Sequence, residues 1–380
     1  MEPRQQLEKL ADDQLLRELH PIAHTTKNLR IVRDGCEMWN FASNDYLGLS
    51  THPEIASAFI EGINIYGTGS AASRLVTGTF NAHTDLENIL AEAKHTEAAL
   101  TFNSGFATAL STIPVIVGIG DFVVLDRLAH ASLIDAARHS QATLRVFPHN
   151  DLTHLGALLS KLRNKHSEAR ILVVTESIFS MDGDRCPLLE IVDLCYTHRA
   201  QLLLDEAHAI GIIGPTGMGL AEELGLQDRI DFQMGTLSKA VGLSGGYLAA
   251  SKDWIDLIIN RSRPFIYTTA PPPALAHAAI SAIQLIRSEE GAELRKKLFQ
   301  NISILQPNHP SAILPIIFGE NQTALDASKK LEQNGYLIPA IRFPTVPKHT
   351  ARLRITLSAK HPKGVVEDLV KQLAQKIEVD

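Results

Sequence analysis

Short apolar runs alternate with longer amphipathic stretches through the middle of the chain. The runs fall at residues 98–102, 122–126, 144–147, 171–176, 201–206, 231–236 and 246–251. Helix-like segments lie between the first several runs, at residues 132–140, 151–166 and 187–199. Continuous apolar strands separated by helices are typical of a mostly parallel sheet that is covered on both faces. The pattern therefore predicts a large α/β domain over residues 46–285.

The pattern shortens after residue 285. Residues 311–319, 336–343 and 351–358 are predicted strands, and residues 321–335 and 361–378 are predicted helices that pack on them. This predicts a small α+β domain over residues 286–380. We expect it to join the N-terminal segment, residues 1–45, which begins with a charged, helix-like stretch.

Composition narrows the class of protein without indicating its chemistry. Of 380 residues, 45% are hydrophobic and 21% are charged, as in ordinary globular proteins. The net charge of −6 gives no reason to expect nucleic acid or an anionic membrane as a partner. Three cysteines without CxxC spacing predict neither a disulfide framework nor a zinc site. Because no apolar signal-peptide segment occurs at the N-terminus, we expect a cytoplasmic protein.

Several familiar sequence motifs are absent, incomplete or in the wrong structural context. No Gly-Lys dipeptide occurs, so a Walker A phosphate loop is absent, and no HExxH occurs among the sixteen histidines. The segment 67–73 lacks the third glycine of a dinucleotide fingerprint. Residues 242–246 do match the G-x-S-x-G elbow of serine hydrolases, with Ser244 as nucleophile. That motif needs a helix after it, whereas a strand-like run follows here. A serine hydrolase is thus one alternative, against a plain glycine-rich turn.

Residues suited to pyridoxal 5′-phosphate (PLP) chemistry occur at strand ends. PLP needs a lysine to form an imine and an acid to keep its pyridine nitrogen protonated. Asp205 ends an apolar strand, where α/β folds bind ligands, and His208 follows three residues later. Lys239 ends another strand-like segment, near the hydroxyls of Thr236 and Ser238. The sequence thus places an acid and a nucleophilic amine at the same edge of the predicted sheet.

Other residues complete the set. The junction Ser104-Gly105-Phe106 between a strand and a helix would present free N–H groups and the helix dipole to an anion. His130 and Ser180 each follow a strand. Each residue alone has a plainer explanation, such as a helix N-cap or a solvated edge charge. The hypothesis of a PLP site therefore rests on their ordered combination.

Taken together, these strings closely resemble the α-oxoamine synthases, which are PLP-dependent transferases of fold type I. The resemblance covers nearly the whole chain, in order. The shared strings lie at residues 43–50, 103–109, 126–136, 149–155, 175–184, 205–219, 235–246, 266–273 and 352–361.

The resemblance implies a role for each matching residue. Lys239 would carry the imine, Asp205 would pair with the pyridine nitrogen, and His208 would bind the ring hydroxyl. His130 would stack on the ring. The phosphate would be held by Gly105, Phe106, Ser180 and Thr236. Arg17 and Thr345 match positions that bind substrate, and Arg342 matches the arginine that holds the amino-acid carboxylate, which suits a bidentate guanidinium.

The resemblance also implies an activity. We expect a decarboxylative condensation of L-alanine with a pimeloyl thioester, on coenzyme A or a carrier protein. The product would be 8-amino-7-oxononanoate, in biotin biosynthesis, and the enzyme would be a homodimer. A glycine C-acetyltransferase that makes 2-amino-3-oxobutyrate and a non-catalytic binding protein with the same fold are the alternatives. Two departures from the family pattern, Ser238 before the lysine and Arg74 after Ser73, have effects that the sequence does not reveal.

Overall fold

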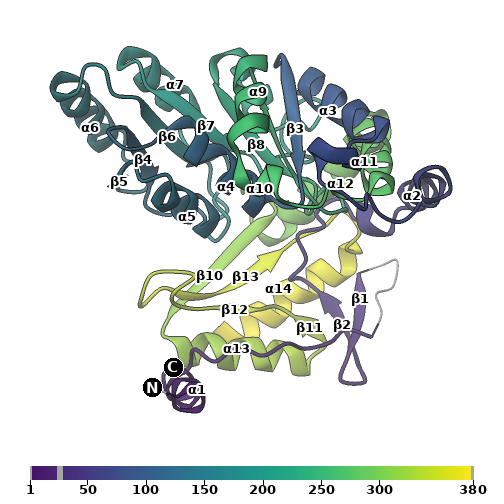
Figure 1. The fold of residues 1–380 in the computed structure, drawn as a ribbon. Helices are drawn as coiled ribbons and strands as arrows, with labels where there is room; N and C mark the ends of the chain where they lie inside the picture. Colours follow the sequence, from purple (N-terminus) through teal and green to yellow (C-terminus); the bar gives the residue numbers. More distant parts are fainter. Residues whose placement is uncertain (1, 24–28, 378–380) are drawn as a thin grey trace. The chain divides into compact units, whose positions relative to one another are not determined.

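The seven apolar runs of the central region form one sheet in a computed structural model of the chain, which describes residues 2–23 and 29–377 (Figure 1). The order of the strands is β3-β9-β8-β7-β6-β4-β5. β9 runs antiparallel to both neighbours, and the remaining pairs are parallel. The predicted mostly parallel sheet is thereby confirmed. Its strands are β3 (Ala98–Phe102), β4 (Phe122–Asp126), β5 (Thr143–Phe147), β6 (Ile171–Glu176), β7 (Gln201–Asp205), β8 (Phe232–Thr236) and β9 (Gly246–Ala250).

Helices cover this sheet. α4, α5 and α9 pack on it through buried apolar side chains such as Ile113, Leu133 and Ile258. α3, α6 and α7 contact β3, β5 and β7 respectively. Burying one such aliphatic side chain stabilises the fold by roughly 1.5–3 kcal/mol. The helices are α2 (Pro53–Tyr66), α3 (Asn81–Ala93), α4 (Gly105–Ile116), α5 (Ala131–His139), α6 (Leu152–Lys165), α7 (Leu188–Thr197), α8 (Leu220–Glu223), α9 (Lys252–Arg261), α10 (Arg263–Ile266) and α11 (Pro273–Arg287).

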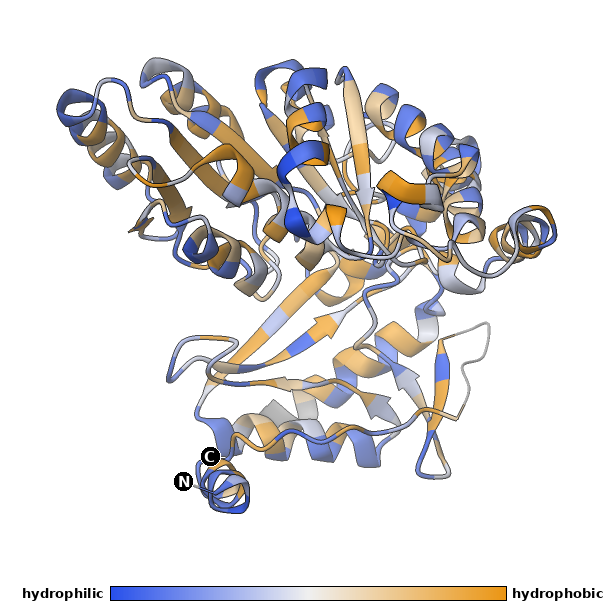
Figure 2. Ribbon diagram, viewed as in Figure 1, coloured by the Kyte–Doolittle hydropathy of each residue, from blue (hydrophilic) through white to orange (hydrophobic). Residues whose placement is uncertain are grey.

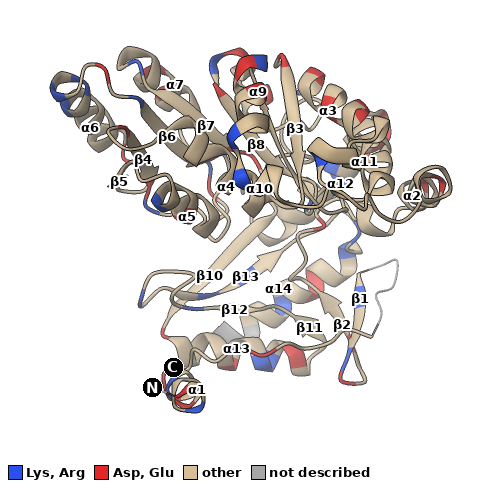
Figure 3. Ribbon diagram, in the orientation of Figure 1, with Lys and Arg blue, Asp and Glu red and all other residues tan. Residues whose placement is uncertain are grey.

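Hydropathy and charge separate cleanly in this part of the chain. The strands of the large sheet are mostly hydrophobic (Figure 2), and the acidic and basic residues gather on the helices and loops (Figure 3). Strands buried on both faces carry continuous apolar runs, which is why their positions could be read from the sequence. No helix among the described residues is long and apolar enough to cross a bilayer.

The remaining residues form a second compact unit. One unit comprises residues 47–180 and 184–295, with the large sheet, and the other comprises residues 1–46, 181–183 and 296–380. α12 (Glu289–Leu305) passes from the first to the second. The smaller unit contains α1 (Pro3–Asp12), β1 (Arg30–Arg33), β2 (Cys36–Asn40), β10 (Ile313–Gly319), α13 (Asn321–Gln333), β11 (Tyr336–Leu337), β12 (Ala340–Ile341), β13 (Ala351–Thr356) and α14 (Lys363–Ile377).

The single strand predicted over residues 336–343 was wrong. Its two ends belong to different three-stranded sheets, β1-β2-β11 and β10-β13-β12. β11 pairs parallel with β2, and β12 pairs antiparallel with β13. Pro339 lies between the two short strands and has no N–H to donate to a ladder, so continuous pairing through it is disfavoured.

The parallel strands place their last residues along one edge of the large sheet. β4, β6 and β7 end in the acids Asp126, Glu176 and Asp205, and β8 ends at Thr236. Glu176 and Asp205 lie directly opposite each other in the β6–β7 ladder. Three acids from adjacent strands therefore meet where open α/β sheets bind their ligands.

Candidate active site

A cavity of about 240 Å³ lies at this edge of the sheet. It brings together all four predicted catalytic residues and most of the predicted phosphate-binding residues. Its lining consists of Ser104, Gly105, Phe106, His130, Ser132, Glu176, Asp205, Ala207, His208, Met234, Thr236, Ser238 and Lys239.

Asp205 and Lys239 form the charged centre of the cavity. Asp205 is only 5% exposed, and its Oδ1 accepts a hydrogen bond from the amide of Ala207 at 2.9 Å. Burial raises the pKa of Asp205 above its ordinary value, while the positive charge of Lys239 and the Ala207 hydrogen bond oppose that rise. A buried acid suits the protonated pyridine nitrogen of PLP, and a lysine beside it suits the imine.

The N-terminus of α4 forms one wall of the cavity. Ser104 is the N-cap, and its Oγ accepts a hydrogen bond from the amide of Ala107 at 3.1 Å. The amides of Gly105 and Phe106, in the first turn, have no partner within the helix and are placed to bind an anion. Gly246 on β9 permits the close approach, since a Cβ there would lie 2.7 Å from the Gly105 nitrogen.

Thr236 and Ser238 form a hydroxyl pair beside the lysine. Thr236 Oγ1 donates to the carbonyl of Gly245 at 2.7 Å. It therefore accepts from Ser238 Oγ, 2.7 Å away, and from the Ser238 amide at 3.2 Å. The hydroxyl and the amide of Ser238 thus help to fix the turn that leads to Lys239.

His130 caps α5 and faces the same cavity. Its Nδ1 lies 2.8 Å from Ser132 Oγ and accepts from the Ser132 amide at 3.2 Å. Burial lowers the pKa of His130, and Lys239 lowers it further although Asp205 opposes this. The imidazole is therefore biased towards the neutral form, which suits stacking on an aromatic ring.

Glu176 is a site residue that the sequence analysis missed. It is 2% exposed, lines the cavity, and accepts a hydrogen bond from the backbone amide of His130 at 2.6 Å. Burial, followed by the charge of Asp205, raises the pKa of Glu176 well above its ordinary value. The available signal was its position as the last residue of an apolar strand, the same signal that singled out Asp205.

Four predicted residues do not line this cavity. Ser180 is buried in the hairpin that follows β6. Arg17, Arg342 and Thr345 belong to the other unit, where they lie together. Arg17 Nη2 donates to Thr345 Oγ1 at 3.4 Å, and the Arg342 guanidinium donates to the carbonyl of Gln14. The substrate-binding roles of these residues stay predictions.

Arg74 is held inside the large unit and is 8% exposed. Its two terminal nitrogens bond both carboxylate oxygens of Glu87, at 2.8 and 2.9 Å, and Nη1 also reaches Thr101 Oγ1 at 3.2 Å. Its Nε donates to Thr79 Oγ1 at 3.0 Å. The guanidinium thus joins α3 and β3 to the segment that begins at Arg74. Arg74 therefore serves to hold these elements together.

The turn that contains Ser244 has the wrong context for a nucleophile elbow. Residues 242–246 lead directly into β9, so a strand follows the motif where a helix would be required. The glycine-rich turn inferred from the sequence is therefore present, and its positive φ angles at Gly242 and Gly245 explain those two glycines.

The mostly parallel sheet, with a lysine, a buried acid and a helix N-terminus around one cavity, defines a PLP-dependent transferase of fold type I. The model of the aminotransferase class I and II family matches residues 37–373. The chain belongs to this family, in the branch of the 8-amino-7-oxononanoate synthases, because curated members of that branch match nearly its whole length.

Two of these relatives show the extent of the match. The 8-amino-7-oxononanoate synthase of Geobacter sulfurreducens is 42% identical over 97% of this chain and 96% of that protein. The enzyme of the same name from Maricaulis maris is 45% identical over 90% of this chain and 88% of that protein. The family expected from the sequence strings is thereby confirmed.

Solved structures agree on the fold. Serine palmitoyltransferase from S. paucimobilis, solved with bound PLP-myriocin, has a TM-score of 0.92 and 28% identity, covering 98% of this chain and 96% of that one. An 8-amino-7-oxononanoate synthase from Francisella tularensis, at 24% identity, shares the fold with a TM-score of 0.74, covering 90% of this chain and 98% of that one. The predicted fold type, cofactor and acyltransferase class are confirmed.

Proposed function

We propose that the chain condenses L-alanine with a pimeloyl thioester to give 8-amino-7-oxononanoate, CO2 and the free thiol. The main support is the single cavity that gathers Lys239, Asp205, His130 and His208 with the N-terminus of α4. The near-full-length match to 8-amino-7-oxononanoate synthases supports this choice of substrates over glycine and acetyl-CoA.

The residues of the cavity fit PLP by their chemistry. Lys239 would hold the cofactor through its amine, Asp205 would pair with the pyridine nitrogen, and His208 would bind the ring hydroxyl. Amides of Gly105 and Phe106 would bind the phosphate. When bound, PLP supplies an electron sink for the carbanion that forms at the α-carbon of the amino acid.

The protein groups then carry the proton transfers. Lys239 Nζ, released when the amine of L-alanine takes its place, would remove the proton from the α-carbon as general base. The α-carbon forms a bond to the thioester carbonyl, the carbon–sulfur bond breaks, and the thiol leaves. The alanine carboxylate departs as CO2, and the carbon receives a proton back. N–H donors of His130 and His208 would stabilise the oxyanion of the attacked carbonyl.

The remaining partners are proposals of the same kind. Arg342 would bind the carboxylate of alanine, with Arg17 and Thr345 contributing to substrate binding. Ser180 would complete the phosphate site, and the enzyme would act as a homodimer in the cytoplasm. The acyl donor would be carried on coenzyme A or a carrier protein.

One experiment tests the cofactor site. The visible absorption of purified wild type should change when L-alanine is added, and Lys239→Ala should lack the starting band. A colourless wild type that does not respond to L-alanine would contradict the proposal. Product analysis with alanine plus pimeloyl-CoA, against glycine plus acetyl-CoA, then decides the substrate pair, and formation of 2-amino-3-oxobutyrate would favour the C-acetyltransferase.

A further inference from the structure

We propose that His149 is a positioning residue that ties the loop carrying His130 to the hairpin carrying Ser180. The inference rests on the proposed function, because these two segments matter for catalysis only if they serve a PLP site. It starts from the string at 149–155, which belongs to the family resemblance but lies outside the cavity.

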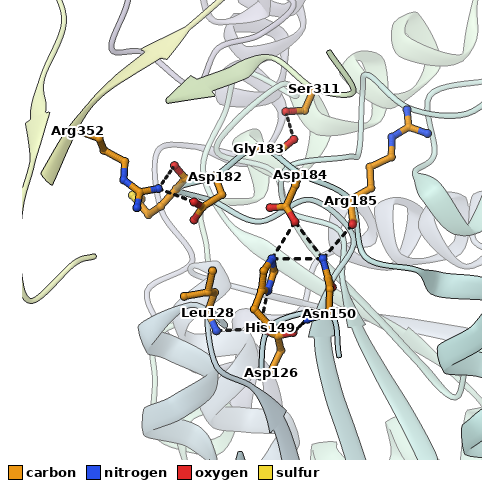
Figure 4. A network of polar contacts seen from close by, with 11 residues as sticks. Asp126, Leu128, His149, Asn150, Asp182, Gly183, Asp184, Arg185, Ser311 and Arg352 are labelled. Atoms are coloured by element: carbon orange, nitrogen blue, oxygen red, sulfur yellow. Dashed lines mark hydrogen bonds and ion pairs between the residues drawn. The ribbon is translucent and has the colours of Figure 1, made fainter. Parts of the chain in front are cut away.

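His149 bridges two carboxylates (Figure 4). Its Nδ1 lies 2.9 Å from Oδ1 of Asp126, and its Nε2 lies 2.8 Å from Oδ2 of Asp184. The ring also packs edge-on against Phe179, with centroids 4.3 Å apart and planes at 88°. A single imidazole therefore joins the end of β4 to the base of the hairpin after β6.

The bridge requires a protonated ring. A carboxylate can only accept, so both ring nitrogens must donate, and only the imidazolium has two N–H groups. The charged groups that face it are Asp126 from β4 and Asp184 from the hairpin, while the neighbouring Arg185 is paired with Glu223. Burial alone lowers the pKa of His149, but the hydrogen bonds and charges of the two aspartates raise it to about 10.

Asp126 transmits this contact to His130. Its Oδ1 also accepts the amide of Leu128 at 2.8 Å, two residues before His130. Its Oδ2 accepts the amide of Asn150 at 2.9 Å. Because Asp126 is 1% exposed, these hydrogen bonds form away from water and hold the carboxylate in one orientation. The path of the chain from β4 to His130 is thereby fixed.

Asp184 transmits the contact to the hairpin over residues 177–186. Its carbonyl accepts the amide of Phe179 at 3.0 Å, which closes the hairpin around Ser180. The side chain of Asn150 adds a second link, since its Nδ2 donates to Asp184 Oδ2 at 3.0 Å. Loss of the bridge would release the loop that carries His130 and the neighbouring hairpin, which lie at the same edge of the sheet.

Three substitutions distinguish the effect of the hydrogen bonds of His149 from the effect of the negative charge of Asp184. His149→Gln has both N–H groups on one nitrogen and so cannot replace the two separate ring donors, and Asp184→Ala removes one of the aspartates. Asp184→Asn keeps the contact with His149, because its amide can donate to Nε2 of a neutral imidazole whose Nδ1–H still donates to Asp126, but it loses the hydrogen bond from Asn150 Nδ2. His154→Gln is the matched control, since His154 is an exposed histidine on the following helix.

The readouts are kcat and the visible circular dichroism of PLP bound to the holoenzyme, which reports how the cofactor is held. We expect His149→Gln and Asp184→Ala to change the dichroism and to lower kcat by about 10- to 100-fold, the cost of a small misplacement at a reacting centre. His154→Gln should match wild type in both, and Asp184→Asn, which loses only the Asn150 link, should lie between wild type and Asp184→Ala.

Two outcomes would overturn the inference. One is a wild-type dichroism and kcat in both His149→Gln and Asp184→Ala; the other is equal damage from Asp184→Asn and Asp184→Ala. If His149→Gln does not fold, the Asp184 pair decides the question alone. A wild type without bound PLP or turnover would instead contradict the proposed function.

Discussion

The backbone amide of His130 donates a hydrogen bond to Glu176 Oε1, 2.6 Å away, so the acid that ends β6 holds the residue that caps α5. The hydrogen bond joins the end of β6 to the loop between β4 and α5, and both residues line the same cavity. The position of His130 therefore depends on the Glu176 carboxyl group.

Removing the Glu176 side chain should disturb this arrangement more than changing its charge. Glu176→Ala leaves the His130 amide without its partner, and we expect it to cost about 1–3 kcal/mol in the free energy of unfolding. Glu176→Gln keeps an accepting oxygen and should lie close to wild type, because the raised pKa of Glu176 already favours its neutral form. Urea unfolding of both variants measures this, and equal losses would contradict the hydrogen-bond explanation.

Lys94 and Glu206 form an ion pair that is fully buried, each side chain being 0% exposed. Lys94 Nζ also donates to the carbonyl of Met218 at 2.7 Å, and Glu206 accepts the amide of Ala221 at 3.0 Å. Lys94→Met would leave an uncompensated buried carboxylate next to Asp205, so we expect a loss of about 3–5 kcal/mol.

The double variant Lys94→Met with Glu206→Gln is the control for this pair. It removes both charges while keeping an acceptor for Ala221, so it should be more stable than Lys94→Met alone. Denaturant unfolding at neutral pH makes the comparison. A double variant that is less stable than Lys94→Met would show that the uncompensated charge of Glu206 is not the cause of the lost stability.

Ser104 should matter for the stability of α4 as well as for the shape of the anion site. Its Oγ caps the helix by accepting the Ala107 amide, and loss of such a cap costs about 0.5–2 kcal/mol. Ser251→Ala is the matched control, because Ser251 stands at the N-cap of α9 without a side-chain cap hydrogen bond. Thermal and urea unfolding should show a loss for Ser104→Ala that Ser251→Ala does not share.

The protonation of His149 predicts how stability depends on pH. Its pKa is raised from 6.5 to about 10 on folding, so its contribution is complete below 6.5 and is lost as the pH rises towards 10. The difference in unfolding free energy between wild type and His149→Gln should therefore be steady just below pH 6.5 and shrink through the alkaline range. Urea unfolding at a series of pH values tests the sign, and a difference that grows with pH would refute it.

The strands of the large sheet could be predicted because most of them carry apolar runs, and several of these runs end in an acid. The runs ending at Asp126, Glu176 and Asp205 share this form. Once they are placed in a parallel sheet, their acids must meet at one edge. The pattern predicts Asp205 at the site, and Glu176, which satisfies the same pattern, lines the cavity beside it.

The small unit was harder to predict, because its strands are short. Residues 336–343 look like one strand, yet Pro339 divides them between two sheets. A two-residue strand has too few side chains to show a period, so its partners are set by distant residues such as Trp39 and Leu353. Nothing local distinguishes one pairing from the other.

The sequence by itself determined the fold class, the edge of the sheet at which the site lies, and the lysine and aspartate around which the site is built. Those conclusions follow from local periodicity and from residue types at strand ends. Only the tertiary structure decided that Glu176 accepts a hydrogen bond from His130, that Arg74 pairs with Glu87, and that His149 bridges Asp126 and Asp184. Each of these contacts joins residues that are far apart in the chain. Hydrogen bonds and ion pairs form only at short range, so the contacts exist only after folding has brought the residues together.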